Sequence, residues 1–158
     1  MEQVDSFKYL GVILDEKWSF TKHVTAVQKK SQQRLHVLRK LRAFYVDPLL
    51  LRLYRSIIEL LITYCNICYY PALSVKSRLL KISHLSAKII GLPTPMLSEI
   101  IDHAILMKAH AIATESVHPL STFFHVLPSR RRYRCIKCKT SRYSRSFVPV
   151  AIRMLNAK

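Results

Sequence analysis

The stretch TKHVTAVQKKSQQRLHVLRKLRAF, residues 21–44, repeats apolar side chains every three or four positions. This spacing is typical of an α-helix that buries one face, and Thr21 can serve as its N-cap. The predicted buried face consists of Val24, Val27, Ser31, Leu35, Leu38 and Leu41. No acidic residue occurs in the stretch. We therefore expect a long helix that packs on one side and has an unusually basic outer face.

The residues before this helix are rich in aromatic and β-branched side chains. Residues 6–14 alternate imperfectly between apolar and polar, the polar segment 15–17 follows, and residues 18–20 alternate again. This pattern predicts a β-hairpin whose turn is formed by residues 15–17. An apolar strand so close to the first residue, with no earlier element to pair with, is also expected in the tail end of a larger protein.

Three further helices are predicted downstream. Asp47-Pro48 can begin the first of them, as N-cap and first helical residue, and this helix is apolar over most of its circumference, as expected of a central buried helix. Pro71 is its last possible end, Ser74 can cap the next helix, and Gly91 with Pro93 can end that one at residue 90. A fourth helix is predicted over residues 96–114. The expected inward positions are Leu79, Ile82, Leu85 and Ile89, then Ile100, Ala104, Met107 and Ala111.

These elements predict a mainly α fold, a bundle of roughly four helices with an N-terminal β-hairpin and a basic C-terminal extension. The predicted domains are the hairpin (1–22), the helical domain (23–115) and the extension (116–158). The segment from Phe147 to Asn156 is apolar again. We expect it to form a short helix that holds the basic extension in place.

The charge of the chain is its strongest indication of function. Lys and Arg number 26 against 9 Asp and Glu, a net charge of +17. Such an excess favours a polyanionic partner, above all nucleic acid. A weaker alternative is an acidic segment of a larger protein. An anionic membrane is also a weaker alternative, and we expect no membrane association because the basic residues are spread along the chain. The predicted nucleic-acid-binding residues are Lys29, Lys30, Arg34, Arg39, Lys40, Arg42, Arg130, Arg131, Arg132, Tyr133, Arg134, Arg142, Tyr143 and Arg145.

Several classes of protein are excluded by composition. The chain has only two glycines, so it lacks the Gly-rich loops that bind nucleotide phosphates. The most apolar run is interrupted by Glu59 and Asn66 and is shorter than the roughly 20 residues needed to cross a bilayer. The mixed charges of the first residues are unlike a signal peptide. We expect an intracellular protein, nuclear or cytoplasmic, with its cysteines as thiols.

Cysteine pairs are the only candidate metal ligands. Cys65 and Cys68, and Cys135 and Cys138, each have the two-residue separation that lets both sulfurs face one zinc ion. The pairs are much farther apart than in common zinc modules, and the first pair falls in an apolar helix where small buried side chains are expected. We therefore predict no metal and no cofactor, with a four-cysteine zinc site as the less favoured alternative.

The acidic residues do not form a catalytic set. Two-metal phosphoryl transfer needs two or more carboxylates at one site, whereas the neighbours Asp15 and Glu16 fall in the predicted turn. Glu59 is alone on an apolar helix, and we expect it to pair with a cation from a neighbouring helix. The chain is not expected to be an enzyme by itself.

The phrase Phe7-Lys8-Tyr9-Leu10-Gly11-Val12, followed by Trp18 and His23, resembles the region after the palm of non-LTR retrotransposon (LINE-type) reverse transcriptases. Shorter similarities recur in the same order at Lys29–Leu35, Leu127–Arg134 and Arg142–Arg153. The resemblance implies a thumb-like helical domain that binds RNA or an RNA–DNA duplex. The implied primer-grip-like residues are Phe7, Tyr9, Leu10, Gly11 and Trp18. The catalytic Tyr/Phe-x-Asp-Asp motif of that family has no match here, which implies that a palm domain precedes this region in a parent protein.

A second resemblance is confined to the basic helix. Residues 29–41 are similar to the N-terminal domain family of the AlkB-type tRNA-modifying dioxygenase. It implies an RNA-modification accessory domain, without the catalytic His-x-Asp motif of the dioxygenase. A structural remnant that binds nothing is a further alternative.

Overall fold

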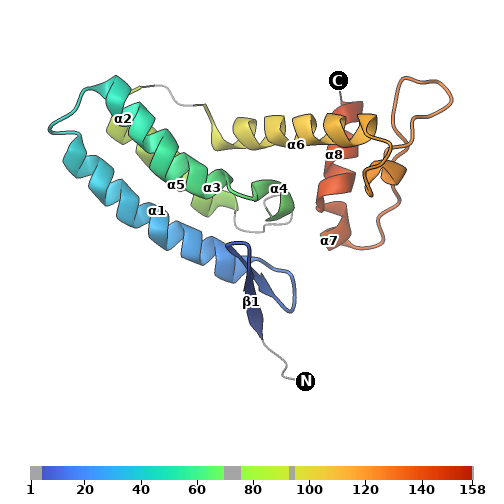
Figure 1. Ribbon diagram of the computed structural model, residues 1–158, viewed down its shortest axis with the longest axis horizontal. Coiled ribbons are helices and arrows are strands. Elements are labelled where there is room, and N and C mark those ends of the chain that lie inside the picture. The colour runs from blue at the N-terminus through green and yellow to red at the C-terminus, as the bar shows by residue number, and fades with distance from the viewer. Residues whose placement is uncertain (1–4, 70–75, 93–94, 158) are drawn as a thin grey trace. The chain divides into compact units, whose positions relative to one another are not determined.

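The computed structural model describes residues 5–69, 76–92 and 95–157, and the fold is mainly α (Figure 1). The elements are β1 (Ser6–Tyr9), β2 (Val12–Asp15), α1 (Thr21–Leu41), α2 (Asp47–Tyr54), η1 (Arg55–Glu59), α3 (Leu60–Thr63), α4 (Asn66–Tyr69), α5 (Lys76–Ile90), α6 (Leu97–Thr114), η2 (Ser121–Phe123), α7 (Ser141–Ser144) and α8 (Phe147–Asn156). The predicted fold class, mainly helical with an N-terminal hairpin, is confirmed.

The chain forms two compact units. The first unit comprises Met1–Asn66 and Leu73–Ser98, and the second comprises Ile67–Ala72 and Glu99–Lys158. The predicted division by role, into a hairpin, a thumb-like domain and an extension, stays a prediction.

The hairpin has its turn earlier than predicted. β1 and β2 pair antiparallel, with Tyr9 opposite Val12, so the turn consists of Leu10 and Gly11. Both residues have positive φ angles, 45° and 84°, as a two-residue type I′ turn requires. A turn does form at residues 15–18, where the Trp18 N–H donates to the Asp15 carbonyl at 2.9 Å, but it follows β2 and does not connect the two strands. The prediction of the hairpin turn at residues 15–17 was wrong because the Leu-Gly pair gave only half of the usual Asn-Gly signal. Residues 18–20 are not a strand but lead into α1.

Helix α1 buries the face that the sequence predicts. Its buried residues are His23, Val24, Val27, Ser31, Leu35 and Leu38, and α1 packs against α5 and against the α2–η1–α3 run. Leu41 is half-buried. The helix begins at Thr21 itself, so Phe20, with a φ of 55°, is the cap residue instead of Thr21. The core of the first unit therefore lies along one side of α1.

The second predicted helix is a continuous helical run, α2–η1–α3, with a π-turn in its middle. Its buried residues are Leu50, Tyr54, Ile58 and Ile62, one every four positions. Such a spacing drifts around a regular α-helix, which has about 3.6 residues per turn, and the wider π-turn takes up part of this drift. Leu60 is 63% exposed, so the prediction of a helix buried on nearly all sides was wrong.

Helix α5 ends where the sequence predicts. Gly91 follows Ile90 with a φ of 79°, the left-handed conformation that glycine favours after a helix. The buried side chains of α5 include Leu79, Ile82, Ser83, Ser86 and Ile90. Leu85 is exposed and Ile89 half-buried, which corrects the predicted inward face. The predicted signals Pro71, Ser74 and Pro93 lie outside the described residues.

The second unit is built from α6 and the segments after it. The bounds of α6 agree with the prediction, but its buried residues are Leu97, Ile101, Ile105, Ala109 and Ile112. These residues are offset from the predicted Ile100, Ala104, Met107 and Ala111, of which Met107 and Ala111 are exposed. The apolar C-terminal segment forms α8, as predicted, and buries Pro149, Ala151 and Ile152.

Candidate nucleic-acid interface

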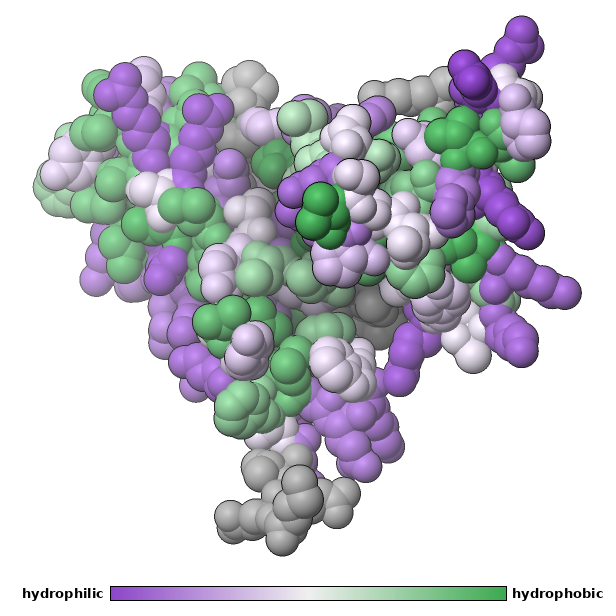
Figure 2. All heavy atoms as spheres, turned by 45° about the vertical axis from the view of Figure 1, so that its right-hand side comes forward, coloured by the Kyte–Doolittle hydropathy of each residue, from purple (hydrophilic) through white to green (hydrophobic). Residues whose placement is uncertain are grey.

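The outer face of α1 carries several exposed basic side chains. It consists of Lys22, Lys29, Gln33, His36 and Lys40, all exposed. Their spacings of seven, four, three and four place them on one side of the helix, opposite the buried face. Figure 2 shows such hydrophilic side chains projecting from the surface beside hydrophobic ones. The exposed Lys30 and Arg39 lie on the two flanks of this face.

In the first unit, two of the predicted binding residues make contacts within the fold. The Arg34 guanidinium donates to the Ile57 carbonyl in the π-turn. Arg42 donates to the Ile90 carbonyl at the end of α5 and forms an ion pair with Asp47, with 3.3 Å between Nη1 and Oδ1. Both arginines connect α1 to its neighbouring helices. Of the predicted α1 cations, Lys29, Lys30, Arg39 and Lys40 therefore have the freest approach to a ligand.

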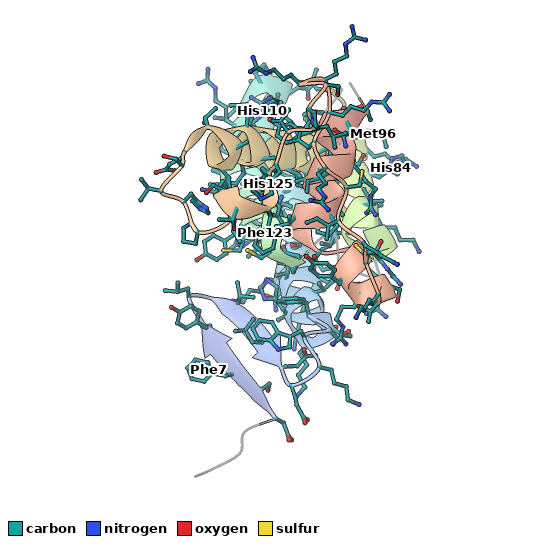
Figure 3. All side chains as sticks on the ribbon, turned by 90° about the vertical axis from the view of Figure 1, so that its right-hand side faces the viewer. Phe7, His84, Met96, His110, Phe123 and His125 are labelled. Atoms are coloured by element: carbon teal, nitrogen blue, oxygen red, sulfur yellow. The ribbon has the colours of Figure 1, made fainter. Side chains whose placement is uncertain are left out.

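The hairpin exposes the predicted primer-grip-like residues. Phe7 and Tyr9 lie two positions apart on β1, on one face of the strand, and Leu10 and Trp18 are also exposed. Figure 3 shows the Phe7 ring projecting outward from β1. The Tyr64 hydroxyl donates to the Leu10 carbonyl at 2.7 Å, so the hairpin turn is held against the end of α3.

A cavity of about 140 Å³ lies behind the hairpin. The residues that line it are Lys8, Gly11, Ile13, His23, Ala26, Val27, Lys30, Leu61 and Tyr64. Within this lining, His23 Nδ1 accepts a hydrogen bond from the Ile13 N–H at 3.4 Å. Burial lowers the pKa of His23 below its usual 6.5, and the charge of Lys30 lowers it further. The imidazole is therefore kept neutral while two lysines supply the positive charge.

The lowered pKa of His23 makes stability depend on pH. The unfolded chain binds a proton at His23 more readily than the folded chain, so stability is full above pH 6.5 and declines as the pH falls below that value. The slope from this one proton is at most about 1.4 kcal/mol per pH unit. Urea unfolding at a series of pH values measures it. His23→Asn, which keeps an acceptor for the Ile13 N–H, is expected to flatten the decline.

The control is the exposed His36 on the same helix. His36→Gln is expected to leave the pH profile of stability unchanged. A decline that persists in full in His23→Asn would assign the pH dependence to groups other than His23.

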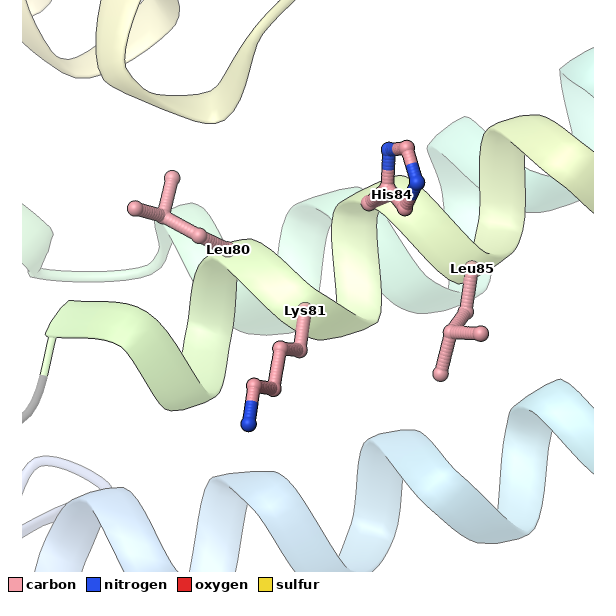
Figure 4. Close-up of a pocket in the computed structure, with 4 residues that line it drawn as sticks. All are labelled: Leu80, Lys81, His84 and Leu85. Atoms are coloured by element: carbon pink, nitrogen blue, oxygen red, sulfur yellow. The ribbon is translucent and has the colours of Figure 1, made fainter.

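A larger hollow of about 470 Å³ lies along α5, lined by Leu80, Lys81, His84 and Leu85. Figure 4 shows Leu80 and His84 on one side of the helix and Lys81 and Leu85 on the other. A ligand site brings a few polar groups together at one point. Because the two polar side chains of this lining diverge, the hollow does not define a site.

The second unit contains an arginine loop, residues 126–133. Val126 and Tyr133 form an antiparallel bridge, and the Leu127 N–H donates to the Arg132 carbonyl at 2.8 Å. Arg130 and Arg131 lie at the tip of this loop, and all its arginines are exposed. The tip is turned by the positive φ of Arg130, 54°.

Tyr133 anchors the arginine loop. Its ring packs edge-on against Phe124, with 6.2 Å between centroids. Its backbone N–H donates to Asn156 Oδ1 at 2.8 Å, and its carbonyl accepts from Asn156 Nδ2 at 3.0 Å. The expectation that the C-terminal helix holds the basic segment is confirmed, because Asn156 is the last residue of α8.

The remaining predicted cations lie between the arginine loop and α8. The short helix α7 is capped by Thr140, whose hydroxyl accepts from the Tyr143 N–H at 3.2 Å. Arg134, Arg142, Tyr143 and Arg145 are exposed, and Arg145 also donates to the Ser141 carbonyl. In this segment the exposed Tyr143 ring lies in sequence between the exposed Arg142 and Arg145, as the sequence indicates.

The cysteines and acidic residues that the structure describes do not gather at one point. Cys65, Cys68, Cys135 and Cys138 are not in disulfide bonds, and among the described residues there is no group of three or more potential ligands around one metal position. Burial raises the pKa of Glu59, and the charge of Arg55, four residues earlier in the same run, partly offsets this. This corrects the expectation of a cation from a neighbouring helix. No helix in the described part of the chain is long and apolar enough to cross a membrane.

Sequence reasoning missed three features near these surfaces. The cavity behind the hairpin is lined by residues far apart in the sequence, such as Lys8, His23 and Tyr64, which no local pattern brings together. Asn156 lies in an apolar helix, and its side chain can hydrogen-bond to the Tyr133 backbone only after the chain has folded. The exposed aromatic pair Phe44 and Tyr45 could have been predicted from the sequence. The pair lies between Arg42 and Asp47, where the next helix begins, and is not part of an apolar repeat that would bury it.

Comparison with known proteins gives one match. Residues 20–59 match the family model described as "Alkylated DNA repair protein alkB homolog 8, N-terminal". The matched residues extend from the cap of α1 to the end of η1. No curated protein and no solved structure matches the chain, and none of the comparisons gives a match to a reverse transcriptase. Of the two resemblances, the one to the N-terminal domain family of the AlkB-type dioxygenase is therefore the one that a comparison supports.

Proposed function

We propose that this chain binds nucleic acid through the outer face of α1 and carries out no chemistry of its own. The observation that carries the proposal is the set of exposed lysines on a helix without a single acidic residue. Lys22, Lys29 and Lys40 are separated by about 10 and 16 Å along the helix axis, so each can approach a different phosphate. Their ammonium groups act as point charges and carry no sequence preference.

The family match supports this proposal. The matched segment contains the whole of α1, and the printed name of the family refers to the repair of alkylated DNA, which is a nucleic-acid substrate. By this reading the chain is an accessory domain that holds a nucleic acid for a modifying enzyme. An enzyme domain encoded in the same gene would support it.

A second candidate is the thumb region of a LINE-type reverse transcriptase. It is favoured by the hairpin, which exposes Phe7, Tyr9, Leu10 and Trp18 just before α1. By this reading α1 holds an RNA–DNA duplex, and the palm with the catalytic carboxylates belongs to the parent protein. A Tyr/Phe-x-Asp-Asp sequence encoded directly upstream would favour this reading over the accessory domain.

Both readings predict the same salt dependence of binding. Each lysine–phosphate contact adds about 0.9 to the slope of log affinity against log salt concentration. The double variant Lys29→Ala/Lys40→Ala is expected to reduce this slope by about 2. Fluorescence anisotropy of a labelled RNA–DNA hybrid between about 50 and 200 mM salt measures it.

The matched control is Gln32→Ala, which changes an exposed neutral residue of the same helix that lies outside this face. It is expected to leave both the affinity and the slope unchanged. If the wild-type chain binds no hybrid, duplex or single strand at the lowest salt concentration, the proposed function is wrong.

A further inference from the structure

The connection between α1 and α2 exposes an aromatic pair. This aromatic loop, residues 43–46, lies between the blue and teal helices at the left of Figure 1. Phe44 is 80% exposed and Tyr45 is 45% exposed, and Val46 beside them is exposed as well. The aromatic loop is thus a concentrated apolar surface that the fold itself does not use.

The aromatic loop has a defined conformation. The N–H groups of Phe44 and Tyr45 both donate to the Leu41 carbonyl, at 3.0 and 3.1 Å. On the other side, the Val46 carbonyl accepts from the N–H groups of Leu49 and Leu50. The two rings are therefore held outside the unit by backbone hydrogen bonds at both ends of the loop, and exposing them to a partner requires no rearrangement.

The surroundings of the aromatic loop are positively charged. Arg39 and Lys40 precede it on α1, and Arg52 follows on α2, all exposed. The one acidic residue of α1, α2 and the loop is Asp47, which is paired with Arg42. An acidic or phosphate-bearing partner is therefore favoured, and a cationic one is disfavoured.

We propose that Phe44 and Tyr45 stack on unpaired bases of a nucleic acid whose phosphates contact α1. This inference rests on the proposed function and adds a substrate class to it: a single strand, or a duplex with a single-stranded end. Aromatic rings bind single strands because every base has a π-face, while neighbouring cations bind the backbone. The bases of an intact duplex are already stacked on each other, so a blunt duplex offers these rings no equivalent partner.

Substitution by leucine separates stacking from simple burial of apolar surface. Phe44→Leu/Tyr45→Leu keeps an apolar loop but removes both π-faces. Its affinity for a labelled single-stranded oligonucleotide is expected to fall roughly 5- to 100-fold, while its affinity for a blunt duplex and its salt slope stay unchanged. Val46→Ala, in the same loop, is the matched control and is expected to leave both affinities unchanged.

A second variant provides a direct signal of stacking. Phe44→Trp is expected to show quenching of indole fluorescence, beyond that of the wild-type chain with Trp18, when a single strand is added and not when a blunt duplex is added. Circular dichroism of each variant verifies that the fold is intact, as expected for exposed positions.

Three outcomes would overturn the inference. The first is unchanged single-strand affinity in Phe44→Leu/Tyr45→Leu. The second is weaker binding of this variant than of the wild type to vesicles containing phosphatidylserine, with no effect on single strands, which would assign the loop to an anionic membrane. The third is a loss of single-strand and duplex affinity by the same factor. Failure of the proposed function is distinct, because it would abolish binding to the blunt duplex in the wild-type chain as well.

Discussion

Leu38→Ala is expected to lower the free energy of unfolding of the first unit by about 2–5 kcal/mol. Leu38 is 0% exposed and lies on the face of α1 that packs on α5 and the α2–η1–α3 run. Removing its branched end takes away contacts with several helices at once and leaves a cavity that a packed helix pair cannot close. Since small domains are stable by only about 5–15 kcal/mol, such a loss is a large part of the total.

The neighbouring residue provides a matched control. Val37 belongs to the same helix but is 48% exposed, so Val37→Ala is expected to cost less than about 1 kcal/mol. Urea unfolding monitored by circular dichroism at the helical band measures both variants. Similar losses for the two variants would show that α1 does not pack through the face described. A separate transition that Leu38→Ala leaves in place would belong to the second unit.

The amphipathic pattern predicted α1 well and α6 poorly, for a physical reason. In α1 the side chains off the apolar stripe are mostly charged or polar, so only one face can be buried, and the predicted stripe from Val24 to Leu38 is the buried one. Helix α6 has small or apolar residues on nearly all sides, so many faces satisfy the same pattern. Its tertiary contacts select Ile101 and Ile105 over Ile100 and Ala104, a choice that periodicity does not determine.

The candidate interface was also predicted only in part. Composition and spacing predicted which Lys and Arg residues supply positive charge, because these residues are read directly from the sequence. They did not predict which cations the fold uses internally. Arg34 reaches a carbonyl 23 residues away and Arg42 one 48 residues away, and such contacts exist only after the helices have packed. The shifted hairpin turn has a local cause, since Leu10 adopts a positive φ that non-glycine residues rarely adopt.

Asn156→Ala is expected to lower the free energy of unfolding of the second unit by about 1–3 kcal/mol, because two hydrogen bonds to the Tyr133 backbone are lost. The Asn156 amide also donates to Cys135 Sγ at 3.6 Å, so one side chain connects α8 to both sides of Arg134. Hydrogen exchange at the Tyr133 amide measures the local effect. It is expected to accelerate more than exchange within α8.

Asn156→Asp provides the sharper test. Its carboxylate can still accept from the Tyr133 N–H but cannot donate to the Tyr133 carbonyl, and it places a negative charge beside that oxygen. Protection of the Tyr133 amide is therefore expected to survive in Asn156→Asp and to be lost in Asn156→Ala, although both variants are less stable than the wild type. The exposed neighbour Ala157 is the control, and Ala157→Ser is expected to change neither quantity. Equal exchange rates at Tyr133 in all three variants would mean that the bridge between Val126 and Tyr133 alone holds the arginine loop, and that Asn156 only ends a helix.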